Sequence, residues 1–195
     1  MLSSIEGATY CLSYCDISIF QKLRLRRRLV PTPIIRGATI ADYDAVLSLN
    51  LASVSVLSPM DKARLELLTT MTELFWIVEV EGQVAAFLLA FTDNKAYDSV
   101  NYQWFSERLK QFLYIDRVVI GEQYRRRGIA SQIYRALKNY AQNQQLHWLC
   151  AEIDLKPANP PSIAFHQQQG FIEIGQQQLV GKEKSVSLTA YQVSC

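Results

Sequence analysis

The amino-acid sequence predicts one domain of the α/β (α+β) class, and three observations support this. The chain has 195 residues, of which 49% are hydrophobic and 19% are charged, as is typical of one globular domain of ~100–200 residues. From residue 34 onward, strand-forming runs alternate with segments of helical periodicity. The composition also excludes a wholly disordered chain, a collagen-like repeat and a disulfide-dependent miniprotein.

Charge and cysteine usage narrow the class of protein further. With 20 basic and 18 acidic residues, the net charge is +2, too small to indicate nucleic-acid binding by the whole domain. No stretch approaches the ~18 apolar residues of a membrane span. The apolar run at residues 17–20 precedes the basic residues, the reverse of a signal peptide. The four cysteines form no CxxC pair and have no histidine at zinc spacing. We therefore expect free thiols, no metal, no nucleic-acid or membrane partner, and a cytoplasmic protein.

The first 33 residues show weak periodicity and few turn signals. Pro31 and Pro33 break both helix and strand, so we place a boundary there. Residues 1–33 are predicted to form an N-terminal extension, weakly structured or a tail, and residues 34–195 a single domain. The basic cluster at residues 24–28 is interpreted as a solvated face, with contact to RNA or a membrane surface as the alternative.

The first half of the domain is predicted to contain a strand, two helices and a hairpin. Thr39 and Asp42 are candidate helix caps, and Pro59 ends the first helix. The strand, the second helix and the two hairpin strands are expected at residues 34–38, 62–70, 74–80 and 84–91. The polar and aromatic residues 92–108 are predicted to form a long loop that is ordered over a pocket; the alternative is that the aromatic residues simply pack under the loop.

The second half is predicted to contain a strand, a long amphipathic helix, a strand, a short helix and two closing strands. Gly170 follows the short helix in the position that C-terminal caps favour. These elements are expected at residues 112–120, 128–144, 147–155, 163–169, 171–176 and 185–193.

Residues 118–130 carry the most informative chemistry, because a buried strand there runs through a short turn directly into a helix. Backbone N–H groups at a helix start converge on one spot, and the helix dipole favours an anion there. Gly128 has no Cβ, and Arg125, Arg126 and Arg127 add positive potential. This pattern predicts a phosphate site; the alternative is three arginines on a solvated helix start. The sequence contains neither GxGxxG nor GxxxxGK[ST].

Two motifs resemble one known superfamily. Arg125, Gly128 and Ala130 match the Gln/Arg-x-x-Gly-x-Gly/Ala signature of the GNAT superfamily of acyl-CoA-dependent N-acetyltransferases. A second segment resembles that family's Asn…Ser…Phe-Tyr/His…Gly-Phe element, through Asn159, Ser162, Phe165, His166, Gly170 and Phe171. Residues 101–105 also resemble the Asn-Tyr-x-Trp-Phe element of an uncharacterised bacterial subgroup of predicted acetyltransferases. The resemblance covers residues 34–193.

The resemblance implies a fold and a cofactor. The implied sheet is mixed, mostly antiparallel and twisted, with six or seven strands, helices on both faces and a central splayed parallel strand pair. The cofactor is acetyl-CoA, with no metal. Its pyrophosphate would bind the backbone of Arg125, Arg126, Arg127, Gly128, Ile129 and Ala130. Main-chain groups of Val118, Val119 and Ile120 would pair with its pantetheine arm, and Asn159, Ser162 and His166 would lie beside that arm.

The family transfers the acyl group directly to an amine, and the sequence shows no nucleophile motif. Strand alternation places Tyr114, Asp116, Val118 and Ile120 on one face. Asp116 is the first candidate base and Glu152 the second; alternatively, Asp116 pairs with an arginine and only shapes the pocket.

The candidate acid is His166, which stands where many relatives have a tyrosine. Its alternative role is packing at the cofactor edge, and the second choices for the acid are Tyr102 and Tyr114.

The predicted activity is transfer of acetyl from acetyl-CoA to a primary amine of a small molecule or peptide. The alternatives are acetylation of a protein N-terminus or lysine, and a non-catalytic acyl-CoA-binding module. Homodimers are common in the family, so a homodimer is included among the expected states.

Overall fold

Seven strands form one mixed sheet within residues 32–54, 57–179 and 183–194, the part of the chain that this computed structural model describes. The strand order is β1-β2-β3-β4-β5-β7-β6. The strands are β1 (Ile34–Gly37), β2 (Leu74–Val80), β3 (Gln83–Thr92), β4 (Phe112–Ile120), β5 (Trp148–Lys156), β6 (Ile172–Leu179) and β7 (Lys184–Gln192). The extension up to residue 31, with its basic cluster, lies outside the described residues.

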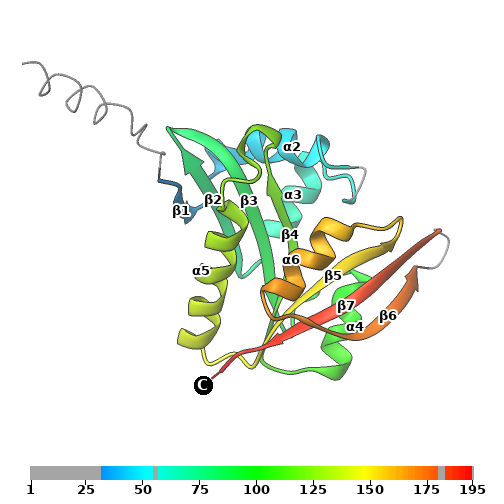
Figure 1. Cartoon of the computed structure of the whole chain (residues 1–195). Helices are drawn as coiled ribbons and strands as arrows, with labels where there is room; N and C mark the ends of the chain where they lie inside the picture. Colours follow the sequence, from blue (N-terminus) through cyan, green and yellow to red (C-terminus); the bar gives the residue numbers. More distant parts are fainter. Residues whose placement is uncertain (1–31, 55–56, 180–182, 195) are drawn as a thin grey trace, which may run out of the picture. The chain divides into compact units, whose positions relative to one another are not determined.

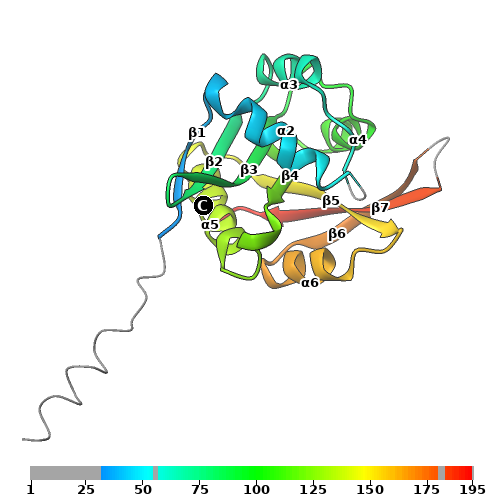
Figure 2. The ribbon, with the colours of Figure 1, turned by 90° about the horizontal axis from the view of Figure 1, so that it is seen from above.

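The parallel pair is β4 and β5 at the centre of the sheet, and every other neighbouring pair is antiparallel. The described helices are η2 (Ile40–Asp42), α2 (Tyr43–Leu51), α3 (Lys62–Thr69), α4 (Val100–Arg108), η3 (Glu122–Tyr124), α5 (Ile129–Asn143) and α6 (Pro160–Gln168). Figures 1 and 2 show α2, α3 and α4 on one face of the sheet and α5 and α6 on the other. The predicted fold class, a mostly antiparallel sheet covered on both faces, is confirmed.

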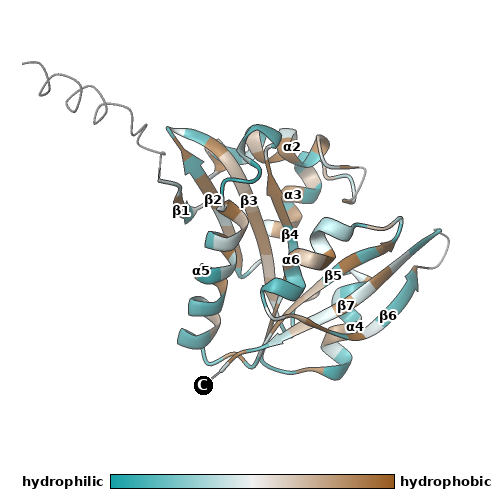
Figure 3. Ribbon diagram, viewed as in Figure 1, coloured by the Kyte–Doolittle hydropathy of each residue, from teal (hydrophilic) through white to brown (hydrophobic). Residues whose placement is uncertain are grey.

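Each face of the sheet buries its own core. Beneath α2, α3 and α4 the core is rich in aromatic residues, including Phe91, Tyr97, Tyr102, Phe105, Phe112 and Tyr114. Beneath α5 and α6 it is mainly aliphatic, and α5 contributes Ile129, Ile133 and Leu137 to it. The opposite side of α5 is hydrophilic (Figure 3). The amphipathic pattern of this segment therefore determines which side of α5 faces the sheet.

Residues 100–108 form helix α4, although the sequence pattern predicted a loop throughout 92–108. Ser99 caps the helix, because its side chain accepts a hydrogen bond from the Tyr102 N–H at 3.4 Å. The buried positions Asn101, Tyr102 and Phe105 follow helical spacing. The buried face is short and includes the polar Asn101, so the sequence shows no clear apolar repeat here.

A β-bulge in β4 lies at Asp116. Leu89 of β3 pairs with Arg117 and Ala90 pairs with Ile115, which leaves Asp116 as an extra residue. The strand therefore changes face at this point. Tyr114 packs in the aromatic core, whereas Val118 and Ile120 pack against the core beneath α5. The predicted common face of these residues is thus wrong beyond Asp116, because strict alternation assumes a strand without a bulge.

The parallel pairing of β4 and β5 covers only three residue pairs, which end at Tyr114 and Cys150. Beyond that point β4 continues to Ile120 and β5 to Lys156 without pairing to each other. Figure 1 shows the two strands diverging, with α6 close to the divergence. The predicted splay of a central parallel pair is therefore present.

Candidate active site

The turn from β4 into α5 forms an open bend lined by backbone N–H groups. Within the described chain, no hydrogen bond uses the N–H groups of residues 126–131. The next donor along, Gln132 N–H, bonds to the Gly128 carbonyl at 3.1 Å. Four of the free N–H groups are the ordinary unpaired donors of a helix start, and together with the helix dipole they favour an anion.

Gly128 keeps this bend accessible. Its φ is +79°, in the left-handed region that favours glycine, and a Cβ built there would meet no atom within 4 Å. Arg126 also has a positive φ of 59°, so the backbone turns sharply on both sides of Arg127. The bend is therefore open space surrounded by donors, which is the arrangement that a phosphate group requires.

Three arginines surround the bend, and none forms an ion pair in the described residues. Arg125 donates from Nε to the Ile120 carbonyl at 3.2 Å. The guanidinium of Arg127 lies over the Tyr124 ring, 5.6 Å from its centroid. Both groups keep their charge available, so the local potential at the bend is positive.

A cavity of about 680 Å³ lies between β4 and β5 past their last pair. Its lining contains nine of the predicted site residues: Asp116, Val118, Val119, Ile120, Arg125, Glu152, Asn159, Ser162 and His166. The other predicted residues lie outside this lining, in the bend and first turn of α5: Arg126, Arg127, Gly128, Ile129 and Ala130. The cavity thus connects the candidate base and acid residues with the predicted cofactor site.

Asp116 is held on both carboxylate oxygens. Its Oδ1 accepts a hydrogen bond from the Tyr97 hydroxyl at 2.6 Å, and its Oδ2 accepts from Arg117 Nε at 2.8 Å. The side chains of Asp116 and Arg117 are only 6% and 7% exposed. Burial, together with the Asp116 charge, raises the pKa of Tyr97, so this phenol remains protonated as a donor.

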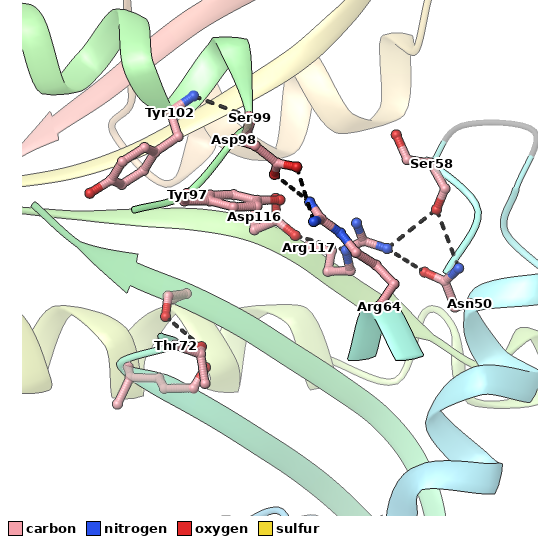
Figure 4. A network of polar contacts seen from close by, with 12 residues as sticks. Asn50, Ser58, Arg64, Thr72, Tyr97, Asp98, Ser99, Tyr102, Asp116 and Arg117 are labelled. Carbon is pink, nitrogen blue, oxygen red and sulfur yellow. Dashed lines mark hydrogen bonds and ion pairs between the residues drawn. The ribbon is translucent and has the colours of Figure 1, made fainter. Parts of the chain in front are cut away.

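Arg117 links this carboxylate to the end of α2. Its Nη1 donates to the Asn50 side-chain oxygen at 2.7 Å and to the Ser58 carbonyl at 3.3 Å. Figure 4 shows these contacts beside the separate pair of Arg64 and Asp98. Arg64 Nη1 donates to Asp98 Oδ2 at 3.0 Å. The network fixes Asp116 in a charge-balanced setting.

Glu152 contrasts with Asp116. Its Oε2 is buried and has no hydrogen-bond partner among the described residues, and the same holds for the fully buried Tyr114 hydroxyl. Burial, reinforced by the Asp116 charge, raises the pKa of Glu152 to about 7. Burial and the Glu152 charge in turn raise the pKa of Tyr114. Glu152 is therefore a carboxyl that can gain or lose a proton near neutral pH.

His166 is buried between α5 and α6 with both ring nitrogens engaged. Nδ1 lies 2.8 Å from the Ser162 carbonyl oxygen, and Nε2 lies 2.6 Å from the Tyr134 hydroxyl. Because a carbonyl can only accept, we assign the ring hydrogen to Nδ1, and Tyr134 then donates to Nε2. Burial lowers the pKa of His166, which keeps this neutral tautomer. In this arrangement the ring has no hydrogen to give to the cavity.

The sequence did not single out Tyr97 and Tyr134 as site residues, and it treated Arg117 only as an unnamed arginine. All three line the cavity. The adjacency of Arg117 to Asp116 was a usable signal, but Tyr97 lay in the predicted loop and Tyr134 among apolar residues of a helix. The second-choice acid Tyr102 lies in the aromatic core, where its hydroxyl donates to the Thr92 carbonyl at 2.8 Å.

Neither a metal cluster nor a membrane span is found in the described part of the chain. No group of three His, Cys, Asp or Glu side chains there is arranged to hold a metal ion. None of the helices in residues 32–54, 57–179 and 183–194 is long and apolar enough to cross a bilayer.

Several solved structures share this fold. An N-acetyltransferase from Staphylococcus aureus Mu50 aligns with a TM-score of 0.66 at 20% identity, covering 84% of this chain and 99% of its own. Ribosomal-protein-alanine N-acetyltransferase from Brucella melitensis aligns with a TM-score of 0.63 at 22% identity, covering 82% and 99%. YncA from Salmonella typhimurium, solved with its cofactor acetyl-CoA, aligns with a TM-score of 0.60 at 18% identity, covering 84% and 95%. A search of curated protein sequences finds no significant match.

The open bend with its free N–H groups, beside a cleft between splayed parallel strands, suits a ligand that carries phosphate groups. The profile of the Acetyltransferase (GNAT) family matches residues 45–171. The chain belongs to this family. It is an acetyltransferase, and its co-substrate is acetyl-CoA.

Proposed function

We propose that residues 34–195 form an N-acetyltransferase that transfers acetyl from acetyl-CoA directly to a primary amine of a small molecule or peptide. The observation that carries this proposal is the single cavity lining that joins the cofactor end, at Arg125, to two buried carboxylates, Asp116 and Glu152. Acetyl-CoA supplies an acetyl thioester, and transfer forms an N–C bond while the C–S bond breaks.

The residues of the bend fit the cofactor. Six unpaired N–H groups, at residues 126–131, and the open space at Gly128 suit a diphosphate. Arg125, Arg126 and Arg127 would balance its charge, while Val118, Val119, Ile120, Asn159 and Ser162 would lie along the arm. Ile129 and Ala130 would contribute only their backbone groups.

Glu152 acts as the base in this proposal, and Asp116 takes a positioning role. An amine arrives mainly as its ammonium form, because its pKa is ~8–10.5, and must lose a proton before it can attack. Glu152 has a pKa near neutrality and a buried oxygen that has no partner in the described part of the chain, whereas both Asp116 oxygens already accept hydrogen bonds. This reverses the order of the two carboxylates expected from the sequence.

His166 holds the Tyr134 hydroxyl in this proposal and is not the acid. The Nδ1 hydrogen is directed to the Ser162 carbonyl, and Nε2 serves as an acceptor. The leaving thiolate would therefore take its proton from water or from another cavity hydroxyl.

The first experiment tests the cofactor site by calorimetry with coenzyme A. Gly128→Asp places a negative side chain in the open bend and should weaken binding by about tenfold or more. Gly128→Ala is the matched control, because it adds a Cβ that meets no protein atom within 4 Å and the same backbone strain, but no charge. Equal affinities for wild type and Gly128→Asp would remove the site.

The second experiment tests the base by the pH dependence of thiol release. Because a carboxyl acts as a base only when ionised, kcat/KM for the amine should rise with pH through about 7 in the wild-type enzyme. Glu152→Gln should lower kcat by ~10²–10⁴-fold and lose this limb of the profile. A near-normal rate with the same limb would assign the base elsewhere.

A further inference from the structure

We infer that the acceptor is a small monoamine with an uncharged body, an inference that rests on the proposed function. It concerns the charges that line the cavity, because a buried charge is tolerated only when a partner balances it. The ammonium group of the acceptor must therefore meet a carboxylate that the protein has not already neutralised.

Three of the four carboxylates in the cavity lining are already neutralised by cations in the same lining. Asp116 pairs with Arg117 at 2.8 Å. Asp154 Oδ1 lies 2.9 Å from Lys184 Nζ. Asp98 receives two hydrogen bonds from Arg64. Among the described residues of this lining, these pairs leave Arg125 as the one cation without an ion pair and Glu152 as the one carboxylate without an ion pair.

Glu152 is the fourth carboxylate, and no cation of the described chain forms an ion pair with it. Its Oε2 is buried and has no hydrogen-bond partner among the described residues. Arg125 is the unpaired cation in the same lining, and it lies at the turn after β4, where the cofactor phosphates are expected. The cavity therefore offers one site for an anion and one for a single ammonium.

Apolar side chains line part of this cavity, and the Oε2 atom of the base is buried. Leu57, Pro59, Val100, Leu179 and Val186 line the same cavity. Asp116 is 6% exposed at its side chain, and Tyr114 is fully buried. A narrow amine can reach Glu152 at this depth, whereas a charged group further along the substrate would lose its hydration without gaining a partner.

The test compares three amines with the same four-carbon chain by the initial rate of thiol release. Butylamine ends in a methyl group, putrescine in a second ammonium and γ-aminobutyrate in a carboxylate. We expect kcat/KM for butylamine to exceed both of the others by about tenfold or more, because each of the others brings an unbalanced charge. A higher kcat/KM for putrescine, for γ-aminobutyrate or for a short peptide would overturn the inference.

Two variants at the exposed Arg64–Asp98 pair test the charge argument in both directions, since one removes the cation and the other removes the carboxylate. Arg64→Ala frees the Asp98 carboxylate, so the ratio of putrescine to butylamine activity should rise. Asp98→Asn frees the Arg64 guanidinium, so the ratio of γ-aminobutyrate to butylamine activity should rise. Lys62→Ala is the matched control, since it removes a cation from the same helix without touching the cavity. Unchanged ratios in both cavity variants would contradict the charge argument.

Failure of the proposed function and failure of the proposed acceptor class give different results. If the proposed function is wrong, none of the amines releases thiol, and the inference falls with it. If only the acceptor class is wrong, thiol is released, but the charged amines or the peptide are preferred.

Discussion

Glu152→Gln should lower kcat of acetyl transfer by ~10²–10⁴-fold and, at the same time, stabilise the folded protein at alkaline pH. The wild-type carboxyl is buried with an oxygen that lacks a partner. Burial raises its pKa from about 4.5 to about 7. The native state therefore favours the protonated form, and stability is lost as pH rises from the unfolded pKa through the folded one.

The magnitude follows from the size of this pKa difference. Each pKa unit corresponds to about 1.4 kcal/mol, so an ionised Glu152 costs about 3 kcal/mol of folding free energy above pH 7. Glutamine has the same shape and no charge, and its NH₂ group can donate to the Tyr114 hydroxyl. The variant should therefore gain up to about 3 kcal/mol over wild type at pH 8, and almost none near pH 4.

Urea unfolding of both proteins at several pH values measures this difference directly. Other titrating groups are common to both proteins, so they cancel in the comparison. Glu81→Gln, an exposed position in the β2–β3 turn, serves as the control and should show no such dependence. The reasoning is refuted if the two unfolding free energies differ by the same amount at every pH, or if Glu152→Gln is the less stable protein at pH 8.

Two further predictions concern packing and the proposed role of His166. Gly175→Ala should destabilise the fold by about 1–3 kcal/mol, because the new Cβ would lie 2.5 Å from the Trp104 ring; Gly37→Ala, where a Cβ meets nothing within 4 Å, is its control in thermal unfolding. His166→Phe should lower the free energy of unfolding but leave kcat within about threefold of wild type. General acid catalysis contributes about 10²–10⁴-fold, so a fall of that size would return the acid role to His166.

The elements were predictable wherever one residue pattern dominated the segment. Local sequence alone predicts β2, from its run of strand formers, and α5, from its amphipathic repeat. The predicted bounds of both elements lie within a residue of those observed. Helix α4 was missed because its buried face is short and includes the polar Asn101 beside Tyr102 and Phe105. Its stability comes from packing in the aromatic core, which only the folded chain brings together.

The sequence was enough to select several residues that line the cavity, but not to predict their hydrogen-bond partners. Motif and strand position were enough to select Asp116, Glu152 and His166, and all three line one cavity. Their partners come from distant parts of the chain, and one bulged residue reverses the alternation on which face assignments depend. The proposed choice of Glu152 over Asp116 as the base therefore rests on the hydrogen bonds of the folded protein.

The short seam between β4 and β5 has a consequence for the stability of the whole molecule. Only three residue pairs join β4 to β5. Past Tyr114 and Cys150, the edges of these two strands that face each other form no hydrogen-bonded pairs with one another. A ligand that binds between the two strands binds only the folded protein and therefore raises its free energy of unfolding. At a concentration 100 times its Kd it would add about 2.7 kcal/mol. The supply of acetyl-CoA would then govern how long the enzyme survives as well as how fast it works.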